Sequence, residues 1–168
     1  QFQDLCAKGC YLNTVDPNYE TNRIWARWSM EQTLGAIALG NTSAVPWIVL
    51  WMAADPPAGT FNLITNWCRH DAYMGLIMGG KGIHIWSGFR GRAGFSNASF
   101  QAYLDGYLTV ARDLNGPLKL GSVFLRGQRQ TNVTMTITAG PPVLQTIYRG
   151  ATNIYPSLTY SSAMLNGT

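Results

Sequence analysis

Charged side chains are scarce in this sequence. Asp, Glu, Lys and Arg together make up 12% of its 168 residues, against roughly 25% in ordinary soluble domains. A free monomer normally needs a charged surface and avoids large apolar patches, so this deficit favours a subunit that hides much of its surface against partners. A compact enzyme with a neutral surface is the alternative. The formal net charge is +4 without a run of basic residues, which excludes a polybasic nucleic-acid-binding arm within this sequence.

Residues suited to metal binding and redox chemistry are also few. The sequence has two histidines, and its only glutamates are Glu20 and Glu31, too few for the His- and Glu-rich metal cluster of a cupin-type jelly roll. The three cysteines, Cys6, Cys10 and Cys68, form no Cys-x-x-Cys pair, so neither a zinc site nor a redox motif is indicated. We therefore predict no metal and no cofactor, and the cysteine usage favours a reduced, intracellular setting.

One short segment suggests catalysis. Cys68, His70 and Asp71 are the residue types of a nucleophile, a base and an orienting carboxylate. Residues so close in sequence cannot easily meet side chain to side chain in a pocket, and no Gly-x-Ser-x-Gly nucleophile elbow is present. The glycine-rich segment 88–94 lacks the Gly-Lys-Ser/Thr of a phosphate-binding loop. We predict no catalytic residues, and we expect His84 to be a structural histidine in a strand.

The longest apolar run spans residues 44–53 and carries no charge. Ten residues are half of the roughly 20 that a membrane-spanning helix needs. Its β-branched and aromatic content favours a strand over a helix. Alternation then places two apolar sets on opposite faces: Trp47, Val49 and Trp51 on one, and Ile48, Leu50 and Met52 on the other. Because both faces are apolar, we expect both to be covered, by this chain or by another subunit.

The remaining pattern predicts many short strands separated by glycine- and proline-containing turns. Residues 21–34 are predicted as a strand, with a helix as the alternative, and residues 62–78 as a short helix. Further strands are predicted at residues 83–89, 99–104, 107–111, 118–125, 132–138, 143–148 and 157–160. This cadence indicates an all-β fold, an eight-stranded antiparallel jelly-roll β-sandwich with one or two short helices. The predicted organisation is an extended N-terminal arm at 1–20, a jelly-roll domain at 21–160 and a C-terminal tail at 161–168.

Tryptophans and loop arginines are the candidate contact residues. We expect the tryptophans to lie in the core or in interfaces, and they are Trp25, Trp28, Trp47, Trp51, Trp67 and Trp86. Four arginines could contact RNA phosphates, groups of a neighbouring subunit, or only solvent, and they are Arg90, Arg92, Arg126 and Arg129.

The order of these features resembles a viral coat protein. Gly82 to Ile85 reads Gly-Ile-His-Ile, Gly91 to Gly94 reads Gly-Arg-Ala-Gly, and a hydrophobic segment follows at Phe100 to Leu104. This arrangement is similar to that of jelly-roll capsid proteins of plant picorna-like viruses, the group with comoviruses, nepoviruses and cheraviruses, and most like a small cheravirus coat protein. The resemblance implies a structural protein that assembles with sister coat subunits into an icosahedral shell around single-stranded RNA. It also implies location in the virion, and in the host cytoplasm before assembly.

A second interpretation is a secreted jelly-roll lectin or another carbohydrate-binding module. Four Asn-x-Ser/Thr triplets would be glycosylation acceptors in a secreted protein, and they begin at Asn41, Asn97, Asn132 and Asn166. A small hydrolase that uses Cys68 or His70 is a third, more distant hypothesis.

Overall fold

The structure is a computed structural model that describes residues 5–9, 23–40, 43–52, 54–87, 93–130, 133–148, 151–156 and 162–164. At its centre lies a sheet of three parallel strands in the order β1-β2-β3. The strands are β1 (Leu5–Gly9), β2 (Val45–Trp51) and β3 (Gly82–Trp86). Residues Leu5–Gly9, within the segment predicted as an arm, thus pair with the apolar run that the sequence singles out.

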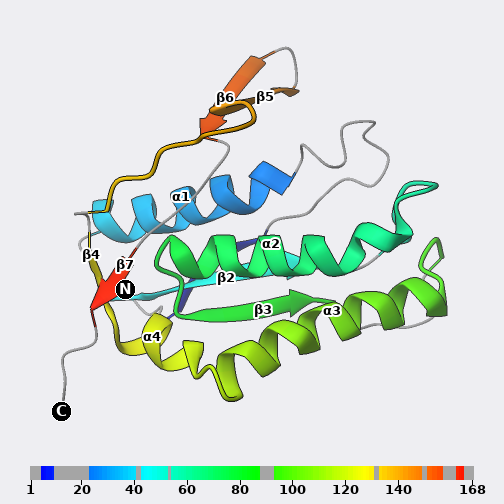
Figure 1. Cartoon of the computed structure of the whole chain (residues 1–168), viewed down its shortest axis with the longest axis horizontal. Coiled ribbons are helices and arrows are strands. Elements are labelled where there is room, and N and C mark those ends of the chain that lie inside the picture. Colours follow the sequence, from blue (N-terminus) through cyan, green and yellow to red (C-terminus); the bar gives the residue numbers. More distant parts are fainter. Residues whose placement is uncertain are drawn as a thin grey trace.

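Helices separate the three strands along the chain. α1 (Ile24–Leu39) lies between β1 and β2, and α2 (Ile64–Ile77), preceded by the short 3-10 helix η2 (Phe61–Leu63), lies between β2 and β3. Both helices cover the same face of the sheet (Figure 1). α3 (Asn97–Asn115) then packs along α2, and α4 (Leu120–Arg126) follows it.

The predicted jelly roll is therefore wrong. The described residues form a mixed α/β fold around a parallel sheet, not an antiparallel sandwich. The strands predicted at residues 99–104 and 107–111 are both parts of α3, and the strand predicted at 118–125 is replaced largely by α4. Residues 133–138 form no strand, and residues 157–160 lie outside the described part of the chain.

Residue spacing explains why α3 is a helix. Its buried residues recur at intervals of one, three or four positions, as the helical period requires, and they are Ser99, Phe100, Tyr103, Gly106, Tyr107 and Val110. Ser96 caps its first turn, because the Ser96 hydroxyl accepts a hydrogen bond from the Ser99 backbone N–H at 3.2 Å. The aromatic residues that favoured strands in this segment are instead buried on one face of α3, and they are Phe100, Tyr103 and Tyr107.

Four predicted elements are confirmed. The apolar run at 44–53 contains β2, and the helix predicted at 62–78 is present as η2 and α2. The strand predicted at 83–89 is present as β3, and the strand predicted at 143–148 is present as β5 (Val143–Tyr148). At residues 21–34, where a strand was preferred and a helix was the alternative, α1 begins at Ile24. The buried residues Ala26, Met30 and Thr33 of α1 recur at helical spacing.

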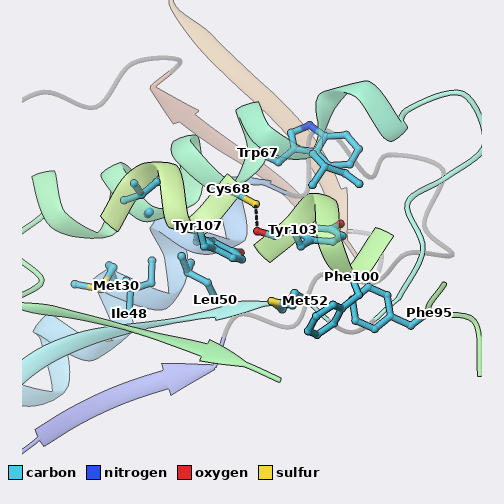
Figure 2. Packing of buried hydrophobic residues seen from close by; sticks show 14 of the residues in the cluster. Met30, Ile48, Leu50, Met52, Trp67, Cys68, Phe95, Phe100, Tyr103 and Tyr107 are labelled. Atoms are coloured by element: carbon cyan, nitrogen blue, oxygen red, sulfur yellow. Dashed lines mark hydrogen bonds between the residues drawn. The ribbon is translucent and has the colours of Figure 1, made fainter. Parts of the chain in front are cut away.

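The hydrophobic core lies between β2 and the helices (Figure 2). Ile48 and Leu50 of β2, and Met52 directly after it, are almost fully buried. α2 approaches β2 closely at Gly75, where an added Cβ would lie 2.6 Å from Ile48 Cδ1. Because glycine has no side chain, the helix backbone can rest directly on the strand.

The C-terminal region contributes two small antiparallel pairs. β4 (Gln128–Gln130) pairs with β7 (Ser162–Met164), and β5 (Val143–Tyr148) forms a hairpin with β6 (Ala151–Pro156). The β5–β6 hairpin lies beyond α1, away from the parallel sheet (Figure 1).

Candidate functional site

The sheet face opposite the helices, here called the outer face, is partly open. By strand alternation its described side chains are those of Leu5 in β1, Val45, Trp47 and Val49 in β2, and His84 and Trp86 in β3. Leu5, Val45 and Trp86 are 47%, 37% and 46% exposed. Ile48 and Leu50, which point to the other face of β2, are 0% and 1% exposed. The helices therefore cover one side of β2 and leave the other in contact with solvent.

Trp47 of the central strand β2 is an aromatic side chain of the outer face. It pairs in register with Gly82 of β3, and a Cβ added at Gly82 would lie 2.5 Å from Trp47 Cε2. The indole ring therefore lies across the glycine, which leaves room for it. Trp47 is half-buried there, while the exposed ring of Trp86 lies at the other end of β3, where the register pairs it with Trp51.

Such an open face is unusual for a parallel sheet. All-parallel sheets occur almost only with both faces covered. In the part of the chain that the structure describes, α1 and α2 pack on one face, and no helix or hairpin packs extensively on the other. Large exposed apolar patches mark interaction surfaces, and Leu5, Val45 and Trp86 would contribute to such a surface if further elements extend it. None of the described helices is long and apolar enough to span a membrane.

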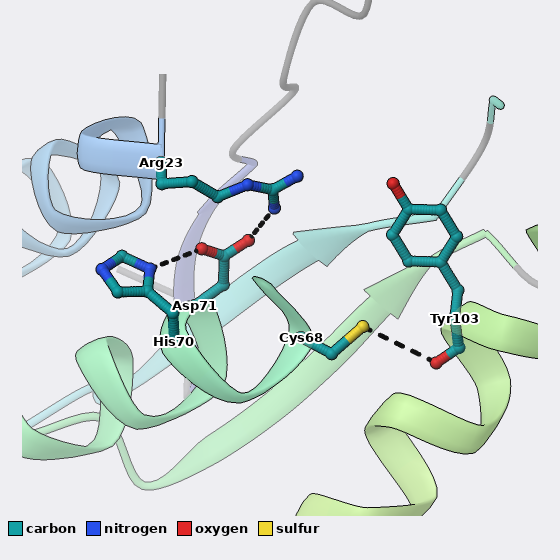
Figure 3. Close-up of polar contacts among 5 residues, drawn as sticks. All are labelled: Arg23, Cys68, His70, Asp71 and Tyr103. Atoms are coloured by element: carbon teal, nitrogen blue, oxygen red, sulfur yellow. Dashed lines mark hydrogen bonds and ion pairs between the residues drawn. The ribbon is translucent and has the colours of Figure 1, made fainter. Parts of the chain in front are cut away.

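The suggested catalytic group does not assemble. Cys68 is fully buried in α2, and its thiol donates to the backbone oxygen of Tyr103 at 3.7 Å. Burial raises the pKa of the Cys68 thiol to about 12, so it stays protonated and is a poor nucleophile. Cys68 and His70 point to different sides of α2 (Figure 3).

His70 and Asp71 instead belong to a structural ion-pair cluster. His70 Nδ1 lies 2.9 Å from Asp71 Oδ1, and Asp71 forms a buried ion pair with Arg23. The Arg23 guanidinium also lies 4.6 Å from the ring centre of Trp67. These contacts hold the start of α1 against α2. Among the described residues, no group of three His, Cys, Asp or Glu side chains could hold a metal ion.

The carboxyl end of β2 is a second place where α/β proteins bind ligands. Asp55 lies there, and its Oδ1 accepts hydrogen bonds from the Ser96 backbone N–H at 2.9 Å and the Ser96 hydroxyl at 2.7 Å. Hydrogen bonds from Ser99 and Ser96 lower the pKa of Asp55. Its carboxylate therefore occupies the N-terminus of α3, the kind of position at which other helices bind phosphate. Sequence reasoning did not single out Asp55, since its partners are more than 40 positions away.

The six tryptophans predicted as core or interface residues lie in different parts of the fold. Trp47 and Trp86 share the outer face, Trp28 is half-buried in α1, and Trp67 is buried against Arg23. Trp25 lies in α1 and Trp51 in β2, opposite Trp86 in the register, with side chains outside the described set.

The predicted arginines do not form one cluster in the described structure. Arg126 is exposed at the end of α4, and Arg129 is described only as a backbone position of β4. Arg90 and Arg92 lie outside the described residues.

Comparisons with protein families, curated proteins and solved structures found no match to this chain.

Proposed function

We propose that this chain is a structural subunit that assembles through the outer face of its parallel sheet. The observation that carries this proposal is the exposure of Leu5, Val45 and Trp86 on one face of a sheet type that is normally covered on both. The low fraction of charged residues, 12%, supports it as well, because a subunit that buries surface against partners needs less charge. The partner that we propose is another copy of the same chain or a closely similar sister chain.

The size of the outer face requires a second contact element. Three strands about 4.8 Å apart, with five residues rising about 3.3 Å each, give a face of roughly 240 Å² in plan. A stable interface buries about 800 Å² on each partner. The β5–β6 hairpin is suited to supply further area, since Val143 and Ile154 are exposed and an isolated two-stranded hairpin is only marginally stable. An outer face on one copy and a hairpin on the next would form a head-to-tail contact.

A viral shell is one form that such an assembly can take. The structure contradicts the jelly roll on which the resemblance to coat proteins was based. The proposal of a shell is therefore supported only by the surface features that favour assembly. Enclosure of single-stranded RNA, and location in the virion, stay predictions. Arg126 is the one predicted RNA-contact residue whose side chain the structure describes, and it is exposed.

The lectin and hydrolase alternatives receive less support. The lectin was predicted as a jelly-roll module, and the structure contradicts that fold. Of the four glycosylation triplets, only Asn97 lies among the described residues, at the first position of α3. The hydrolase loses its nucleophile, because the Cys68 thiol is buried and protonated.

Sedimentation velocity over a range of concentrations tests the proposed assembly. We expect the unmodified chain to form dimers or larger species, and the double substitution Val45→Lys and Trp86→Lys to shift it to monomers without changing its far-UV circular dichroism. The matched control is Leu39→Lys with Leu108→Lys, which charges two exposed apolar positions on α1 and α3, away from the outer face. The control should assemble like the unmodified chain. A chain that is monomeric at every concentration, or an equal effect of both double substitutions, contradicts the proposal.

A further inference from the structure

A cleft of about 660 Å³ lies on the helix-covered side of the fold, between β3, α3 and α4. Its volume falls in the range of about 300 to 1,000 Å³ that is common for small-molecule sites. Much of its lining is apolar, including Ile83 and Ile85 of β3, Val110 and Leu114 of α3, and Phe124 of α4. Ile83 and Ile85 alternate along β3 with His84 and Trp86, so the cleft and the outer face lie on opposite sides of this strand.

The charged residues of the cleft all have the same sign. Lys81, Lys119 and Arg126 line it, and no Asp or Glu is among its described lining residues. The chain as a whole carries only twelve Lys and Arg residues, so three at one cleft is a local concentration of positive charge. A cavity whose walls have low polarity and whose charges are all positive attracts an anion.

The cations gather at one end of the cleft. Lys81 directly precedes β3, Lys119 directly precedes α4, and Arg126 is the last residue of α4. β3 begins beside α4 and runs away from it along α3, in the direction opposite to that helix (Figure 1). Ile85 and Val110 therefore lie farther from α4 than Lys81 does. The cleft has a cationic end at α4 and an apolar end between β3 and α3.

Lys81 also fixes the position of α4. Its Nζ donates a hydrogen bond to the backbone oxygen of Phe124 at 2.7 Å. A lysine ammonium group has three donor hydrogens, so this contact leaves two for a ligand. The hydrogen bond holds the ammonium at the cleft, which reduces the entropy that anion binding would otherwise cost.

We propose that this cleft binds a single-chain amphipathic carboxylate, with the headgroup at Lys81, Lys119 and Arg126 and the hydrocarbon chain between β3 and α3. Charge complementarity selects an anionic headgroup, and the apolar lining beyond it selects an aliphatic chain. Ser122 and Asn115 at the same end can add neutral hydrogen bonds to the headgroup. This site is separate from the assembly surface, so neither proposal depends on the other.

Isothermal titration calorimetry with decanoate, decanol and acetate tests the site on the full chain. Decanoate should bind, while decanol, which lacks the charge, and acetate, which lacks the chain, should each bind at least tenfold more weakly. Lys119→Gln and Arg126→Gln, both at exposed positions, should each weaken decanoate binding roughly fivefold, as expected for a partly solvated charge contact. The matched control Arg112→Gln removes the same charge from an exposed position of α3 outside the cleft and should bind decanoate like the unmodified chain.

Filling the apolar end gives an independent test. Ala111→Trp places a large ring in the cleft from α3 and should abolish decanoate binding while the circular dichroism stays unchanged. If this variant does not fold, the two exposed Lys and Arg variants still decide the question. The proposal is overturned if decanoate does not bind, if decanol binds as tightly as decanoate, or if Arg112→Gln weakens binding as much as Arg126→Gln.

Discussion

The indole ring of Trp47 lies across Gly82 on the neighbouring strand, so close that a Cβ added at Gly82 would be 2.5 Å from Trp47 Cε2. This contact joins the central strand of the sheet to β3 on the outer face. On the outer face, the Trp47 ring therefore occupies the space that a side chain at residue 82 would need.

Gly82→Ala should therefore destabilise the fold. The added methyl group must displace the Trp47 ring, and overpacking of this kind costs about 1 to 3 kcal/mol. Urea unfolding measures the change. Gly35→Ala is the control, because nothing lies within 4 Å of its added Cβ, and alanine in a helix stabilises by about 0.5 to 1 kcal/mol relative to glycine. In a Trp47→Ala background the cost of Gly82→Ala should shrink. An undiminished cost there would contradict the contact.

Loss of the buried ion pair between Arg23 and Asp71 should strongly destabilise the fold. Asp71→Ala leaves the Arg23 guanidinium buried without its carboxylate partner, which costs about 3 to 5 kcal/mol. Glu31→Gln is the control, since it removes a half-exposed i, i+4 pair with Arg27 worth about 0.3 to 0.5 kcal/mol. Thermal unfolding compares the two. Similar losses of stability in both variants would show that the Arg23–Asp71 pair does not hold α1 against α2.

The carboxylate of Asp55 should make the stability of the fold depend on acid pH. Its pKa in the folded chain is lowered by hydrogen bonds from Ser99 and Ser96, below an unfolded value of about 3.9. The charged form therefore stabilises the fold above about pH 4, and this contribution is lost as the pH falls through the lowered folded pKa.

Replacement of Asp55 tests this pH dependence. Asp55→Asn should be less stable than the unmodified chain at neutral pH, and the difference should vanish in acid. Urea unfolding at several pH values measures it, with Asp105→Asn on the exposed face of α3 as the control. A difference between Asp55→Asn and the unmodified chain that stays constant across the acid range would contradict the role of the charge.

The sequence by itself determined the central strand and the helix that follows it. Residues 44–53 are apolar and β-branched over a length that suits a buried strand, so local composition was sufficient there. Residues 62–78 have apolar side chains near helical spacing, and this local pattern was sufficient for α2. The separation of two apolar faces along β2 is also present, because alternation along a strand depends only on backbone geometry. The cover expected for the second face stays a prediction.

Only the tertiary structure decided the architecture and the site. β1 and β2 pair although about 40 positions separate them, and nothing local in the sequence indicates that pairing. α3 contains aromatic segments that suit short strands when taken singly, and only their burial along one continuous face against α2 makes the helix the stable choice. The open outer face and the cationic cleft arise in the same way. Each is built from residues that are distant in sequence and meet because the helices bury one side of the sheet and leave the other exposed.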